Sequence, residues 1–335
     1  MLPTGRSASR GTRSGAPRRG ATRLAALLAA IATAAGCGRA RAADPPPPIR
    51  FAVGSSDSVF AIVGAALAAA YNAHPGLAVA TRESLNSQAS ADALERGEVD
   101  LALEGARTSY LAYRRGTPGH PQPHRKLRAL AVLFPTVVHI AARRDLDISN
   151  VSDLRGRRVY VGERGSPTEG ASRAVLSSHG LSFDDIQPFF DRARALEDFR
   201  AGRLDGLIFF FPIEQADGIA MMRGGGATLV PLDPRSLEAI RSRDPLLKPA
   251  AIPAGAYDGQ LAPVPTVGSD VLLVSREDLD EDLVYTLTRT LFESAGGLRR
   301  AHRAAGFIDP GRGPGAPIPL HRGAARYYRE RQLLR

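Results

Sequence analysis

The stretch LRALAVLFPTVVHIAA, residues 127–142, is apolar except for Arg128, Thr136 and His139. A continuous apolar run bounded by loop signals is typical of a strand that is buried on both faces. Strands usually hold about 5–6 residues, so this run is longer than one small sheet needs. We therefore predict a strand that leaves one lobe of the protein and enters a second.

Strand and helix signals alternate before this stretch. The pattern predicts strands at 49–53, 77–81 and 100–103, and helices at 59–72 and 87–96, the second ended by Gly97. Residues 114–125 are rich in glycine and proline and predict a loop. A strand-helix-strand order favours a mostly parallel sheet with helices on both faces.

A second α/β unit follows the apolar stretch. We expect strands at 159–161 and 206–211, helices at 168–179 and 193–201, and an irregular, proline-rich segment at 231–265. A strand at 270–275 and one long helix at 281–303 end the pattern. A return crossover near Thr266 gives lobe 1 from residues 43–138 and 266–335, and lobe 2 from residues 139–265.

Residues 1–42 differ from the rest and predict an export signal peptide. Residues 1–23 carry six arginines and no acidic residue, and the apolar run that follows, 24–35, is too short to span a bilayer. Two ends of the leader remain open. Ala40-Arg41-Ala42 fits a cleavage site before Ala43, whereas Ala34-Ala35-Gly36-Cys37 resembles a lipobox that would leave Cys37 lipidated. Either way we expect a periplasmic protein, in contact with a membrane only through such an anchor.

The leader also accounts for the basic composition. Eight of the 44 Lys and Arg residues precede Ala43, so 36 basic residues remain against 34 acidic ones. No basic stripe with interleaved aromatic residues follows, which argues against nucleic-acid binding. Cys37 is the only cysteine, which excludes an intramolecular disulfide and a thiolate metal site.

Two strand-to-helix turns are candidate ligand-binding loops. Ser166 can cap the helix that starts at Pro167, with Glu169 completing a capping box. The same helix start can bind a carboxylate or phosphate through free amide groups. Residues 54–58 form the matching turn before the first helix, and ligands of parallel sheets bind beyond the carboxyl ends of the strands. This turn and its rim contribute Ser55, Ser56, Asp57, Ser58, Thr81 and Ser84, and Phe60 belongs either to the core or to the cleft wall.

The sequence contains none of the common catalytic motifs. The sequence has no GxGxxG, Walker or GxSxG motif. His120 and His124 are four residues apart, but Pro121 and Pro123 prevent the helix that would place both on one metal ion. We therefore expect no catalytic residue, no cofactor and no metal.

Four segments carry a family resemblance: VSDLRGRRVYVG at 151–162, GSPT at 165–168, DLVYTLT at 282–288 and IPLHRGAARYYRE at 318–330. Together they resemble the TAXI family, the extracytoplasmic solute receptors of tripartite ATP-independent periplasmic (TRAP) transporters. The resemblance implies a two-lobed periplasmic-binding-protein fold of type II, with two mostly parallel sheets and a ligand cleft between the lobes. It also implies a monomeric receptor that binds a small carboxylate or an amino acid such as glutamate and docks on TRAP membrane subunits.

The resemblance also implies which residues meet the solute. In the second lobe these are Gly165, Ser166 and Thr168, with Phe211 and Pro212 as cleft wall; in the first lobe they are the hydroxyls of 55–58. Arg107 replaces an expected acidic residue and is either a carboxylate clamp or a surface arginine. Two alternatives stay open: a secreted interaction or antigen-like protein with a degenerate site, or an enzyme on the same scaffold using Asp57.

Overall fold

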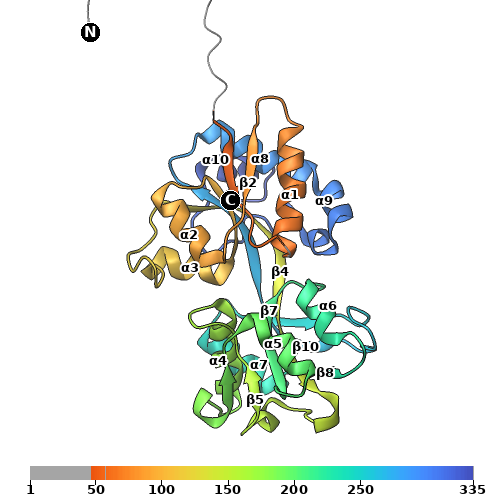
Figure 1. The fold of residues 1–335 in the computed structure, drawn as a ribbon. Coiled ribbons are helices and arrows are strands. Elements are labelled where there is room, and N and C mark those ends of the chain that lie inside the picture. The colour runs from red at the N-terminus through yellow and green to blue at the C-terminus, as the bar shows by residue number, and fades with distance from the viewer. Residues whose placement is uncertain (1–46, 57, 335) are drawn as a thin grey trace, which may run out of the picture. The chain divides into compact units, whose positions relative to one another are not determined.

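The computed structural model describes residues 47–56 and 58–334. The expected leader with Cys37 and the candidate residue Asp57 lie outside the described residues. The rest forms two α/β lobes, an upper and a lower one in Figure 1. The strands are β1 (Ile49–Ala52), β2 (Val79–Arg82), β3 (Leu101–Gly105), β4 (Leu127–Arg143), β5 (Arg158–Tyr160), β6 (Gln187–Phe189), β7 (Gly206–Phe211), β8 (Ala227–Leu229), β9 (Lys248–Ile252) and β10 (Val264–Arg276).

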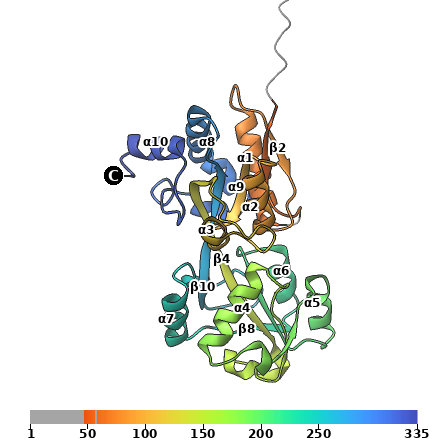
Figure 2. The ribbon, with the colours of Figure 1, turned by 90° about the vertical axis from the view of Figure 1, so that its left-hand side faces the viewer.

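Helices cover both faces of each lobe's strands (Figures 1 and 2). The upper lobe holds α1 (Val59–Asn72), α2 (Ser87–Arg96), α3 (Ala106–Arg115), α8 (Glu281–Glu293), α9 (Ala295–Ala301) and α10 (Arg322–Glu330). The lower lobe holds α4 (Pro167–Ser178), α5 (Arg192–Arg200), α6 (Ala216–Met222) and α7 (Pro234–Arg243). Short 3-10 helices lie at Arg144–Leu146, Val151–Leu154, Phe183–Asp185 and Arg303–Phe307.

The strands form one hydrogen-bonded network in the order β2-β1-β3-β10-β4-β7-β5-β6, with β8 on β4 and β9 on β10. The outer strands of each lobe, β2-β1-β3 and β7-β5-β6, pair in parallel. The central strands β4 and β10 are antiparallel to their neighbours. The predicted two-lobed α/β fold is confirmed, and its two sheets are joined because β4 and β10 are shared.

The apolar stretch 127–142 lies in the 17-residue strand β4. Its first part pairs with β10, from Leu127 opposite Arg276 to Val137 opposite Gly268. Its last part pairs with β7 in the lower lobe, up to Ala142. The long strand is therefore a physical link between the lobes, and β10 runs beside it in the opposite direction (Figure 2).

Each lobe buries apolar side chains on both faces of its strands. In the upper lobe Leu67 of α1 and Leu287 of α8 pack on one face, and Leu94 of α2 packs on the other. In the lower lobe Val175 of α4 and Phe199 of α5 lie in separate clusters. Each such side chain contributes roughly 1.5–3 kcal/mol when fully buried, so each lobe has its own core.

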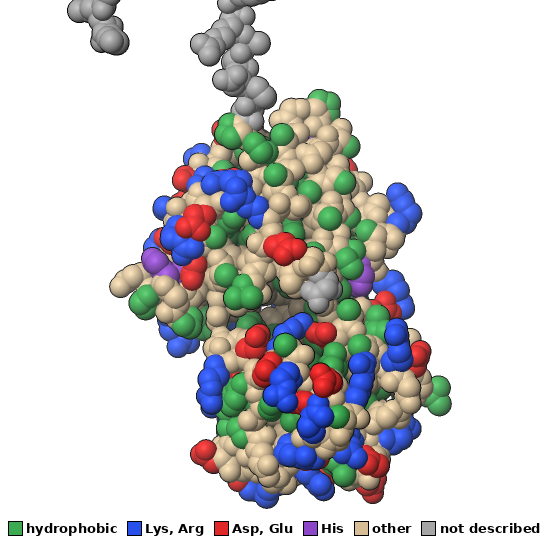
Figure 3. All heavy atoms as spheres, viewed as in Figure 1, with side chains coloured by type: hydrophobic (Ala, Val, Ile, Leu, Met, Phe, Trp, Pro, Cys, Tyr) green, Lys and Arg blue, Asp and Glu red, His purple; other side chains and the backbone are tan. Residues whose placement is uncertain are grey.

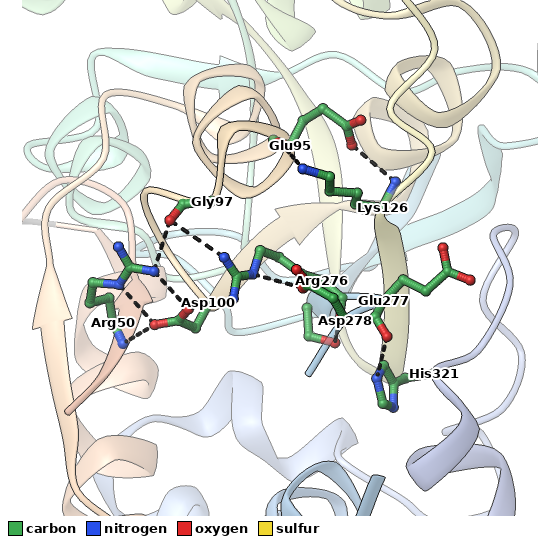
Figure 4. A network of polar contacts seen from close by, with 10 residues as sticks. Arg50, Glu95, Gly97, Asp100, Lys126, Arg276, Glu277, Asp278 and His321 are labelled. Carbon is green, nitrogen blue, oxygen red and sulfur yellow. Dashed lines mark hydrogen bonds and ion pairs between the residues drawn. The ribbon is translucent and has the colours of Figure 1, made fainter. Parts of the chain in front are cut away.

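A polar network fixes the returning C-terminal segment to the upper lobe (Figure 4). Arg50 of β1 donates from Nε and Nη2 to the Asp100 carboxylate, at 2.9 and 2.8 Å. Arg276, at the end of β10, approaches the same carboxylate with Nη2 at 3.3 Å. Asp100 thus links the first strand to a strand that lies more than 200 positions later in the sequence.

Several segments differ from the prediction, among them β6, α6 and β8, which were not predicted. The proline-rich segment 231–265 is not irregular, because it contains α7 and β9. Pro234 is compatible with α7 because it stands in the first turn, after the N-cap Asp233. The helix expected at 281–303 is interrupted at Ser294, before two glycines, and α3 was not predicted.

Candidate functional site

A cavity of about 360 Å³ lies between the two lobes. Figure 3 shows a hollow at this junction. The cavity lies beyond the carboxyl ends of β1 and β5, where ligands of parallel sheets bind. Its upper wall contains Gly54, Ser55, Ser58, Phe60, Leu85, Asn86, Ser87, Ser90 and Leu103. Thr136 on β4 and the lower wall complete it, the latter with Tyr160, Glu163, Ser166, Pro167, Thr168, Arg192, Phe210, Phe211, Pro212 and Gln215.

The upper rim is the loop before α1. Ser58 is the N-cap: its Oγ accepts from the Ala61 amide at 3.1 Å and donates to the Ser55 carbonyl at 2.6 Å. Gly54 has a φ of +80°, which allows the sharp turn that places this loop above the cavity. Ser55 and Ser58 line the cavity, whereas the exposed Ser56 does not.

Phe60 contacts the core and also forms part of the cleft wall, the two positions that the sequence left open. Its ring lies edge-on to Phe134, a core residue, with centroids 6.0 Å apart. It also lines the cavity. The side chain therefore forms the boundary between the upper core and the cleft.

The lower rim is the loop before α4. Ser166 caps this helix, as predicted, and its Oγ accepts from the Glu169 amide at 3.1 Å. The Glu169 carboxylate accepts from the Gly165 amide at 2.6 Å and forms an ion pair with Arg173 at 2.7 Å. Gly162 has a φ of +92°, and a Cβ there would lie 2.5 Å from the Glu169 nitrogen. The loop therefore has one tightly determined path, which brings Ser166 and Thr168 to the cavity.

Three cavity residues that were not predicted form a polar end. The Tyr160 side chain is 1% exposed, and its hydroxyl has no hydrogen-bond partner among the described residues. Burial is the main cause that raises the pKa of Tyr160; nearby Arg192 lowers this pKa and Glu163 raises it. Arg192 forms an ion pair with Asp217. Glu163 forms no ion pair within residues 47–56 and 58–334.

The predicted second-lobe wall residues Phe211 and Pro212 also line the cavity. Other candidates lie elsewhere. Thr81 is exposed on β2, and Ser84 donates to the Asn86 carbonyl at 3.1 Å and accepts from Ser90 at 2.7 Å, so it supports the rim from behind. Gly165 lies outside the main cavity and lines a neighbouring one of about 320 Å³.

Arg107 lines that neighbouring cavity as well, and does not reach the main one. Its Nε donates to Asp244 Oδ2 at 2.5 Å. Arg107 lies in the first turn of α3 in the upper lobe, and Asp244 follows α7 in the lower lobe. The guanidinium is therefore neither a free clamp nor a free surface group, but one half of a contact between lobes.

Two further hydrogen bonds join the lobes next to the cavity. The Val59 amide, at the start of α1, donates to Gln215 Oε1 at 2.9 Å. Gln88 of α2 donates from Nε2 to the Gly165 carbonyl at 2.8 Å. An ion pair between Arg303 and Glu214 adds a third bridge. The two helix starts that flank the cavity are thus each bonded to the opposite lobe.

Nothing in the described part of the chain adds a metal centre or a membrane span. No group of three His, Cys, Asp or Glu side chains there is placed to hold a metal ion. No helix in residues 47–334, Asp57 aside, is long and apolar enough to cross a bilayer. His124 is fully buried, and its Nε2 lies 2.7 Å from the Asp92 carboxylate, so the side chain is part of the packed structure of the upper lobe.

Solved structures with similar folds include three binding proteins. The periplasmic aliphatic sulphonate binding protein SsuA from Escherichia coli is 17% identical with a TM-score of 0.48, and the match covers 76% of this chain and 79% of that one. The alkanesulfonate-binding SsuA from Xanthomonas axonopodis pv. citri, bound to MOPS, is 16% identical with a TM-score of 0.47, covering 88% and 96%. The probable amino-acid ABC transporter extracellular-binding protein YtmK from Bacillus subtilis is 12% identical with a TM-score of 0.49, covering 76% and 95%.

The expected fold class, a two-lobed periplasmic-binding-protein fold of type II, is confirmed. A family model described as the NMT1-like family matches residues 51–331. This match includes both lobes, both connecting strands and every described residue that lines the cavity. The chain therefore belongs to the NMT1-like family.

Proposed function

We propose that this protein is an extracytoplasmic receptor that captures a small organic anion or amino acid by closure of its two lobes and delivers it to a membrane transporter. The observation that carries the proposal is the cavity between the lobes, with one helix start on each side. A bound solute would touch both lobes and favour their closed arrangement. Such a receptor acts through a shift of population and needs no covalent step.

The chemistry of the lining supports a small polar solute with a carboxylate. The starts of α1 and α4 each bring the positive end of a helix dipole towards the cavity, and hydroxyls of Ser55, Ser166 and Thr168 lie beside them. Ser58 already donates to a carbonyl, so it positions the loop more than it offers a free donor. The aromatic rings of Phe60, Phe210 and Phe211 can cover an apolar part of the solute.

Delivery to a TRAP transporter is the finer part of the proposal. It rests on the resemblance of residues 151–168, 282–288 and 318–330 to TAXI receptors. The same segments include the α4 loop at the cavity and helices α8 and α10, which pack against each other. The predicted export leader agrees with a periplasmic location, either free or anchored through Cys37.

The degenerate-site alternative lacks support in the cleft, whereas the enzyme alternative depends on Asp57, which lies outside the described residues. An interaction or antigen-like protein with a degenerate site would be favoured if Glu83 or Arg107 blocked the cleft. Neither residue lines the cavity. An enzyme would be supported by two carboxylates placed together in the cleft. Among the described lining residues Glu163 is the one carboxylate.

A thermal-shift screen of the purified protein against organic acids and amino acids tests the proposal. A ligand at 100 times its Kd adds about 2.7 kcal/mol to the free energy of unfolding, so its Tm shift is readily measured. Ser55→Trp should abolish the shift because the indole fills the cavity, whereas Ser56→Trp, in the same loop but outside the cavity, should keep it. Absence of any stabilising carboxylate or amino acid, or a normal shift in Ser55→Trp, refutes the proposal.

A further inference from the structure

The two charged side chains that line the cavity differ in whether an ion-pair partner neutralises them. Arg192 and Glu163 are the charged side chains among the described lining residues. Arg192 is neutralised by its ion pair with Asp217, whereas Glu163 has no such partner in the described part of the chain. The side-chain charge that a solute meets uncompensated is therefore negative.

The opposite sign is supplied by the backbone. Helices α1 and α4 hold 14 and 12 residues and begin at the cavity, so each presents a partial positive charge there. Thr168, in the first turn of α4, is 9% exposed, and its hydroxyl has no hydrogen-bond partner among the described residues. A hydroxyl that lines the cavity beside a helix start, with no partner among the described residues, is a donor available to an anionic group.

Glu163 and this donor group belong to one short loop. The Glu163 carbonyl accepts from the Ser166 amide at 3.0 Å, which closes a tight turn. Glu163 therefore lies on the same rim as the start of α4. A negative and a positive group on adjacent parts of one rim suit a solute whose own charges are adjacent and opposite.

Tyr160, in the lower wall of the cavity, also suits a solute with adjacent and opposite charges. The residue is 1% exposed, its hydroxyl has no hydrogen-bond partner among the described residues, and the charges of Arg192 and Glu163 both act on it. A neutral phenol can accept a hydrogen bond from an ammonium group or donate one to a carboxylate. A solute that reaches Tyr160 can therefore form a hydrogen bond that no described residue supplies.

We infer that Glu163 is a specificity-determining residue that binds the ammonium group of the solute, so that the cavity takes α-amino acids in preference to the corresponding 2-oxo acids. The inference rests on the proposed binding function. It assigns the carboxylate of the amino acid to the start of α4 and Thr168. It assigns the ammonium group to Glu163 and Tyr160.

The test compares matched pairs of ligands by isothermal titration calorimetry of the full chain at pH 7. The pairs are glutamate with 2-oxoglutarate, leucine with 4-methyl-2-oxopentanoate, and phenylalanine with phenylpyruvate. For the pair that binds, we expect the amino acid to bind at least 10-fold more tightly than its oxo acid. Glu163→Gln should weaken amino-acid binding at least 10-fold and leave oxo-acid binding unchanged or tighter. Glu197→Gln, an exposed site in the same lobe that does not line the cavity, is the matched control.

The outcomes separate this inference from the proposed function. If oxo acids bind as tightly as amino acids, or if Glu163→Gln keeps the preference, the receptor function stands and the role of Glu163 is wrong. If no amino acid or oxo acid of the three pairs binds, the role of Glu163 is wrong, and the receptor function is then decided by the thermal-shift screen of other organic acids. A loss of both ligand classes in Glu163→Gln, with circular dichroism unchanged, also contradicts the selective role.

Discussion

Breaking the contact between Arg107 and Asp244 should open the protein without unfolding it. The two side chains are 24% and 21% exposed, so the pair is better shielded than a surface ion pair but is not fully buried. Exposed pairs contribute about 0.2–1 kcal/mol, and charge-assisted hydrogen bonds about 1.5–3 kcal/mol. We take about 1–2 kcal/mol for Arg107→Ala, which corresponds to a change of roughly 5- to 30-fold in the ratio of closed to open molecules.

Small-angle X-ray scattering of the ligand-free protein measures this change as a larger radius of gyration in Arg107→Ala. Asp244→Ala should give the same increase, and the double variant should add nothing further, because either substitution already removes the contact. Arg241→Ala is the control, since Arg241 pairs with Glu238 inside one helix of the lower lobe. A radius of gyration equal in Arg107→Ala and Arg241→Ala, or a double variant with additive effects, would refute the reasoning.

Three other predictions concern stability. Gly162→Ala should lower the free energy of unfolding by more than Gly180→Ala in urea titrations: both have positive φ, which costs about 1–2 kcal/mol, but only at Gly162 would the Cβ meet the backbone, at 2.5 Å. Burial raises the pKa of Glu104 to about 8 from an ordinary 4.5, so the folded state keeps a proton that the unfolded chain loses. Stability should therefore fall as pH rises from about 4.5 to about 8, by at most about 1.4 kcal/mol per pH unit, and Glu104→Gln should flatten this dependence. Tyr71→Phe should raise the free energy of unfolding by about 1 kcal/mol, and with it the Tm, because the buried Tyr71 hydroxyl has no partner among the described residues. An unchanged or lower Tm would contradict this.

The parts of the fold that local signals determine were predictable. The bounds of α1 and α2 match the prediction because each helix begins at a side-chain N-cap, Ser58 and Asn86, and α2 ends at Gly97 in a left-handed conformation. β4 was predictable from its apolar run. By contrast, α7 buries only Ser236 and Ile240, so the periodicity that would reveal it in the sequence is weak.

The residues of the candidate site also divide into those that a local sequence pattern marks and those that packing between distant segments places. Ser55, Ser58, Ser166 and Thr168 line the cavity because each stands where a strand turns into a helix, which is a local property of the sequence. Arg192 and Gln215 reach the cavity from elements whose positions depend on packing between distant segments, and no local pattern marks them. Glu163 had a usable signal, because it follows β5 in the turn before α4, but the prediction considered only residues 165–169 of that turn. The partner of Arg107 is 137 positions away, which a single sequence does not reveal.

The two shared strands also decide when the chain can fold. The upper lobe needs β10 between β3 and β4, and the lower lobe needs both β4 and β10 for β7 and β9 to pair with. A growing chain that ends before residue 264 therefore leaves the edges of β3 and β9 without their partner, and neither lobe has a complete sheet. Folding of consecutive domains usually begins with the N-terminal one during synthesis. Here β10, the last of the described strands, completes both halves, so native structure of either lobe waits until residues 264–276 have been synthesised.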